Sequence, residues 1–109
     1  MSGKPVIPRE QAKRDIEASI DHYLNQAGET AAFKFIDALE RAYLHISRHP
    51  ASGPPRYAHE LDMPGLRCWP LNRYPFLIFY VEREVCLDIW RVLQAERDVP
   101  AWMRDAGSG

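Results

Sequence analysis

The segment that most constrains the fold lies between residues 74 and 98, where two apolar runs are separated by a short charged stretch. Residues 76–82 are apolar at nearly every position, which predicts a central β-strand covered on both faces. Residues 85–93 form the second run, and the charged residues 82–84 predict the tight turn of an antiparallel hairpin. Arg91 interrupts the second run, and because a buried unpaired charge is prohibitive it must reach solvent, a carboxylate or a partner.

Alternation along a strand places this arginine on a definite face. Leu87 and Ile89 lie four and two residues before Arg91, so the three side chains should share one face, which we expect to be open. Arg67, on another predicted strand, is expected on the same face. Together with Arg56, Arg73 and Arg97, these arginines would form a basic surface for phosphates or for an acidic partner segment. The alternative is that they pair with neighbouring surface carboxylates, which is common and weakly stabilising.

Two amphipathic helices precede the hairpin. The first is predicted from Pro8 to Gly28, because proline suits a first helical turn and glycine commonly ends a helix. The second is predicted from Glu29 to His49, ahead of Pro50. Its apolar residues cover an arc of about 200°, against about 120° for the first helix. The second helix must therefore contact both the first helix and a sheet, or leave an apolar patch for a partner.

The remaining segments complete the fold prediction. Residues 4–7 predict a short edge strand, residues 51–64 a loop rich in proline and glycine, and residues 66–71 a further strand. The order strand, helix, helix, strand, strand, strand predicts an α+β fold. In it, the helical hairpin packs on one face of a small, mainly antiparallel sheet. At 109 residues, we expect a single domain spanning residues 1–109.

Charge and hydropathy narrow the classes of function. The net charge of −1 gives no general attraction for nucleic acid. The N-terminal residues lack the apolar run of a signal peptide, and no segment approaches the ~20 apolar residues that span a membrane. We therefore expect a cytoplasmic protein. Cys68 and Cys86 should lie on strands that flank the central strand, too far apart for a disulfide.

Other chemistry-bearing residues have simpler interpretations. His45 and His49 have the spacing of two metal ligands on a helix, but they lie among cations, so we expect a solvated basic ridge and no metal site. Asp15 and its neighbours Glu17 and Asp21 fall outside the apolar stripe of the first helix and are expected in solvent. The chain has no glycine-rich phosphate loop and no nucleophile motif.

Several short motifs, in this order and at this length, resemble the ParE/RelE superfamily of type II toxin–antitoxin toxins. The resemblance covers most of the chain and agrees with the fold predicted above. The motifs are His49-Pro50 with Gly53, Pro64-Gly65-Leu66-Arg67, Tyr74-Pro75-Phe76-Leu77-Ile78-Phe79-Tyr80, Ile89-Trp90-Arg91-Val92-Leu93 and Arg97-Asp98.

The resemblance implies one of two activities. RelE-like members are ribosome-dependent mRNA endonucleases, whereas ParE-like members inhibit DNA gyrase without being nucleases. RNA cleavage needs proton-transfer groups as well as charge stabilisation. Related toxins often carry a histidine after the Arg-Val-Leu stretch, where this chain has Gln94, and no Tyr, His or Lys follows Tyr80. We therefore predict a gyrase inhibitor with no catalytic residue and no cofactor. The alternatives are a nuclease and an inactive antitoxin-binding module.

The resemblance also implies a cognate antitoxin of the ribbon-helix-helix, ParD-like type, which binds the toxin directly in a hetero-oligomer. Such a partner would account for the wide apolar arc of the second helix. We expect the contact at one edge of that arc, Phe35, Ala42 and Ile46, or at the other, Phe33 and Leu44. The alternative is that all five residues belong to the core.

Overall fold

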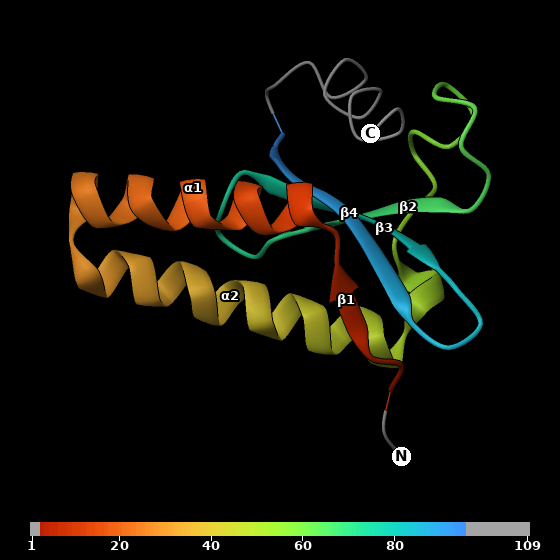
Figure 1. Cartoon of the computed structure of the whole chain (residues 1–109), viewed down its shortest axis with the longest axis horizontal. Coiled ribbons are helices and arrows are strands. Elements are labelled where there is room, and N and C mark those ends of the chain that lie inside the picture. Colours follow the sequence, from red (N-terminus) through yellow and green to blue (C-terminus); the bar gives the residue numbers. More distant parts are fainter. Residues whose placement is uncertain (1–2, 96–109) are drawn as a thin grey trace.

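A four-stranded sheet and a long helical hairpin make up the computed structural model, which describes residues 3–95 (Figure 1). The sheet order is β1-β4-β3-β2, with β1 parallel to β4 and the other neighbours antiparallel. The predicted α+β order is confirmed. The elements are β1 (Val6–Pro8), α1 (Glu10–Ala27), α2 (Glu29–Arg48), the 3₁₀ turn η1 (Pro50–Ser52), β2 (Leu66–Pro70), β3 (Phe76–Glu82) and β4 (Leu87–Gln94).

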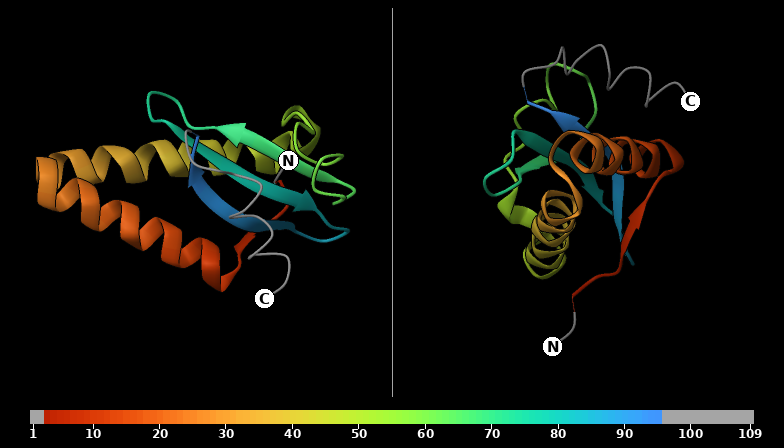
Figure 2. Two further views of the ribbon diagram at one scale, coloured as in Figure 1. Left: turned by 90° about the horizontal axis from the view of Figure 1, so that it is seen from above. Right: turned by 90° about the vertical axis from the view of Figure 1, so that its left-hand side faces the viewer.

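Gly28 alone joins the two helices, as predicted from its place in the sequence. Its φ of 89° lies in the region that favours glycine, and its N–H donates to the carbonyl of Leu24 at 3.1 Å. The reversal is tight enough to place α1 and α2 side by side as an antiparallel pair on one face of the sheet (Figure 2).

Strand β3 is buried on both faces, as its continuous apolar sequence predicts. On one face, Ile78 and Tyr80 pack beneath the helices in a cluster that includes Phe35 of α2. On the other face, Leu77 and Phe79 belong to a second cluster. The expectation of a partly open second face is wrong, because the loop between η1 and β2 packs over it. The loop residues in contact are Tyr57, Ala58, Leu61 and Met63.

A β-bulge in β4 breaks the alternation on which the face prediction depended. Arg91 and Ile89 pair with successive residues of β3, so Trp90 between them has no partner across the hairpin. After the bulge Val92, and not Arg91, joins Leu87 and Ile89 in the cluster beneath the helices. The face prediction from sequence alternation requires a strand without a bulge.

The cysteines are unpaired, as expected. Cys68 lies on β2 and is buried, which raises the pKa of its thiol against the opposing effect of the Arg56 charge. Cys86 is half-buried in the turn that precedes β4, one residue before the strand itself. None of the described helices is long and apolar enough to cross a membrane.

Candidate partner-binding surface

Arg91 is engaged in a buried ion pair with helix α1. Its Nε and one Nη each donate to a different oxygen of Asp15, both at 2.7 Å, and the two side chains are 7% and 13% exposed. Asp15 also accepts the backbone N–H of Val92 at 3.0 Å. The expectations that Arg91 lies on an open face and that Asp15 is solvated are therefore both wrong.

The position of β1 explains why this carboxylate is needed. Strand β1 covers the edge of β4 only as far as Ile89, whose carbonyl accepts the N–H of Arg9 at 2.9 Å. Beyond that point, α1 runs alongside β4, and Asp15 accepts the edge N–H of Val92 that no strand reaches. A buried N–H without an acceptor is costly, so Asp15 replaces the missing strand.

Arg67 also has an intramolecular role. One of its guanidinium nitrogens donates to the carbonyls of Ala51 at 3.2 Å and Gly53 at 2.8 Å. It pairs across the sheet with Tyr80, on the side of the helices, so it does not lie on a common open face with Arg91. Arg97 lies outside the described residues.

The five candidate antitoxin contacts on α2 fall into two groups. Phe35, Ala42 and Ile46 are buried in the core beneath the helices. Phe33 and Leu44, by contrast, are 66% and 51% exposed, although both are large apolar side chains. Of the two edges proposed from the sequence, only the Phe33–Leu44 edge is accessible in the folded chain.

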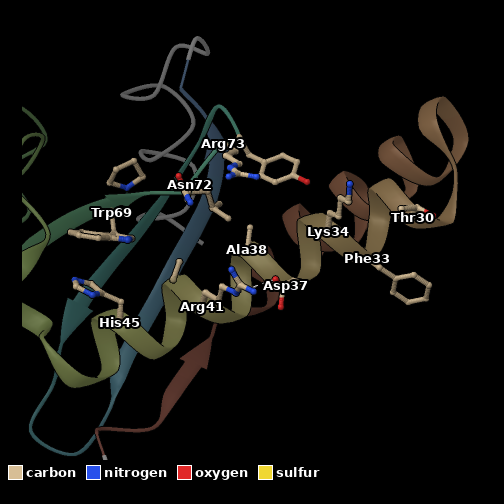
Figure 3. Close-up of a pocket in the computed structure, with 14 residues that line it drawn as sticks. Thr30, Phe33, Lys34, Asp37, Ala38, Arg41, His45, Trp69, Asn72 and Arg73 are labelled. Carbon is tan, nitrogen blue, oxygen red and sulfur yellow. Dashed lines mark ion pairs between the residues drawn. The ribbon is translucent and has the colours of Figure 1, made fainter.

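Beside this edge lies a groove between α2 and the segment from Trp69 to Tyr74, with a volume of about 1060 Å³ (Figure 3). Its apolar lining includes Ala38 and Ala42 on the helix and Leu71 on the sheet side. Phe33 and Thr30 lie at one end, near the start of α2. At the other end the ring of His45 stacks on that of Trp69, with centroids 4.2 Å apart and planes 20° from parallel.

The polar lining of the groove is mainly cationic. Lys34 and Arg41 come from α2, and Arg73 comes from the β2–β3 connection on the opposite side (Figure 3). Arg41 pairs with Asp37 at 3.0 Å. Within residues 3–95, neither Lys34 nor Arg73 forms an ion pair. The groove therefore combines an apolar floor with two positive charges that no carboxylate within residues 3–95 pairs with.

Sequence reasoning missed most of this groove. Lys34 and His45 were assigned to a solvated basic ridge, whereas His45 is half-buried against Trp69 and its Nε2 lies 3.1 Å from the hydroxyl of Ser52. Arg73 was named from the sequence as a member of the predicted basic surface, and the structure places it in the lining of the groove beside α2. It adopts φ of 70°, a conformation uncommon outside glycine.

A second charged cluster surrounds Asp88 at the start of β4. Arg9 donates to both carboxylate oxygens at 3.0 Å, and Arg83 and the Trp90 indole donate to one of them. The Arg9 guanidinium also lies 4.0 Å from the centre of the Trp90 ring. Burial raises the pKa of Asp88, but hydrogen bonds from Arg9, Arg83 and Trp90 and the Arg9 charge outweigh it, so the pKa lies below its usual value.

No group of three or more potential metal ligands from His, Cys, Asp and Glu occurs within residues 3–95. The described groove presents apolar and cationic side chains, a combination suited to binding another macromolecule.

The fold is shared with a known toxin–antitoxin system. The chain is similar to a chain in the solved structure of the chromosomal ParDE system of P. aeruginosa. The TM-score is 0.72 at 22% identity, over 85% of this chain and 97% of that one. The family model described as the ParE toxin of the type II toxin–antitoxin system parDE matches residues 6–99. The chain therefore belongs to the ParE toxin family. A search of curated proteins found no match.

Proposed function

We propose that this member of the ParE family inhibits DNA gyrase and is neutralised by direct binding of a cognate antitoxin. Family membership supports the toxin role. The observation that favours a gyrase inhibitor over a nuclease is the buried ion pair of Arg91, because a cation held by Asp15 is not available to stabilise the charge of a reacting phosphate. Arg67 donates one guanidinium nitrogen to the backbone carbonyls of Ala51 and Gly53.

A gyrase cleavage assay with purified toxin tests the target. We expect purified toxin to accumulate covalent gyrase–DNA complexes on supercoiled plasmid. Reporter transcripts in cells that express the toxin should stay intact. New transcript ends within codons, without gyrase–DNA complexes, would overturn the proposal in favour of the nuclease. Arg97 remains a predicted contact for the target, and Arg97→Ala should then lower gyrase inhibition without weakening antitoxin binding.

For neutralisation, we propose that the antitoxin covers the exposed apolar edge of α2. Phe33 and Leu44 lie 11 residues apart, which returns to nearly the same side of a helix at about 16 Å along its axis. An antitoxin segment lying along this edge would bury both side chains. We expect the partner to be of the ribbon-helix-helix type and to form a hetero-oligomer with the toxin.

The matched variants are Phe33→Asp with Leu44→Asp, and Val85→Asp as the control. Val85 is 75% exposed and belongs to the β3–β4 turn, not to α2. We expect the double variant to stay toxic when the antitoxin is co-expressed, whereas the Val85 variant is neutralised like the parent. If the antitoxin neutralises the double variant fully, α2 is not the contact surface.

A further inference from the structure

From the groove beside α2, we infer that the antitoxin segment docked there is acidic and amphipathic, with apolar residues on the groove floor and carboxylates facing Lys34 and Arg73. This inference rests on the proposed function and specifies the chemistry of the partner. The groove follows α2 from Thr30 to His45, which is about 22 Å of helix and can accommodate four turns of a partner helix.

The positive charges of the groove determine that the docked segment should be negatively charged. Lys34 and Arg73 approach the groove from opposite sides, and neither has a carboxylate partner among residues 3–95. Asp37, the one acidic residue that residues 3–95 contribute to the groove lining, is already paired with Arg41. A segment with carboxylates on both flanks would pair with Lys34 and Arg73, whereas a basic segment would be repelled.

The floor and the closed end provide the apolar contacts. Ala38 and Ala42 are small, so a partner side chain can approach the backbone of α2, while Leu71 and Tyr74 provide apolar surface opposite. The stacked pair of Trp69 and His45 closes one end. Small residues flanked by aromatic rings favour insertion of a large aliphatic or aromatic anchor from the partner.

The same charges argue against a second copy of the chain in this groove. Two copies meeting across the groove would bring Lys34 and Arg73 of each near those of the other, and like charges at an interface oppose association. An acidic peptide segment is therefore the occupant that the groove favours.

The test uses the toxin and, as the antitoxin, the product of a small open reading frame identified next to the toxin gene. The double variant Lys34→Glu with Arg73→Glu is compared with Arg14→Glu with Arg48→Glu. Both change the net charge by the same amount, and Arg14 and Arg48 are exposed residues outside the groove lining. Circular dichroism melts check the folding of each variant. Calorimetry at several salt concentrations gives the affinities.

We expect the groove variant to weaken antitoxin binding at least a hundredfold and to flatten its salt dependence, and the control variant to change it less than fivefold. Ala38→Phe, which fills the floor without altering charge, should also weaken binding at least tenfold. Gyrase inhibition by both groove variants should equal that of the parent. Unchanged antitoxin affinity in both would overturn the groove assignment and leave the proposed function standing. A parent toxin that neither binds this partner nor inhibits gyrase would overturn both.

Discussion

The buried pair between Asp15 and Arg91 gives the sharpest prediction about stability. Asp15→Ala removes the partner of a charge that is 7% exposed and also the acceptor of the Val92 N–H. Breaking a buried pair from one side costs about 3–5 kcal/mol, because the remaining charge loses the two hydrogen bonds to its carboxylate in a site with little solvent. In a domain of this size each 1 kcal/mol shifts Tm by about 4–8 °C, so we expect a fall of more than ~12 °C.

A double-mutant cycle separates the ion pair from the backbone hydrogen bond. In Asp15→Leu with Arg91→Met both charges are absent, and the Val92 N–H loses its acceptor, at about 1–3 kcal/mol. We therefore expect the double variant to be more stable than Asp15→Leu alone. Asp21→Ala, an exposed carboxylate on the same helix, serves as the control and should change stability by less than about 0.5 kcal/mol.

Urea unfolding followed by circular dichroism and tryptophan fluorescence gives these free energies. A loss below about 1 kcal/mol for Asp15→Ala would refute the reasoning, since it would mean that Arg91 and the Val92 N–H do not depend on Asp15. If the double variant folds but no longer inhibits gyrase, Arg91 contacts the target as well.

Two further predictions concern other buried polar groups. The depressed pKa of Asp88 stabilises the fold above the ordinary aspartate pKa of about 4, and this stabilisation is lost as the pH falls through the lower folded value. Asp88→Asn should therefore lower the free energy of unfolding at pH 7. Between pH 7 and pH 3, the variant should lose less of this free energy than the parent does. Equal losses would show that Arg9 and Arg83 do not hold the carboxylate ionised. Tyr43 has a buried hydroxyl with no partner among the described residues, and burial raises its pKa to about 12. Tyr43→Phe should then stabilise the fold by about 1 kcal/mol, measured by urea unfolding. Tyr80→Phe removes hydrogen bonds to Pro50 and Gly53 and should destabilise the fold by about 1–3 kcal/mol. The opposite order of the two variants would contradict this account.

Much of the fold could be predicted from local patterns. The two helices follow from apolar spacing and from Gly28 and Pro50, and the β3–β4 hairpin follows from two apolar runs around a charged turn. These features depend on neighbours in the sequence, where helical and strand periods differ clearly. The ParE family itself was also indicated by the order of short motifs, and the family match confirms it.

The candidate surface was predictable only in part. The apolar arc of α2 indicated that the helix has more than one neighbour, and Phe33 and Leu44 were named as one possible edge. Their exposure, however, depends on how the helix is rotated against the sheet, which periodicity does not fix. The groove depends on Trp69 and Arg73, which only the fold brings beside α2.

By itself, then, the sequence determined the order of the elements, the burial of β3 on both faces of the sheet and the requirement that Arg91 find a partner. Only the tertiary structure decided which partner. The bulge at Trp90 changed the face on which Arg91 lies, and the short length of β1 left the N–H of Val92 for α1 to satisfy. Asp15 lies 76 residues from Arg91 in the chain. The physical reason is that any buried charge needs a partner, which the sequence shows locally, whereas the packing of distant segments determines which group becomes that partner.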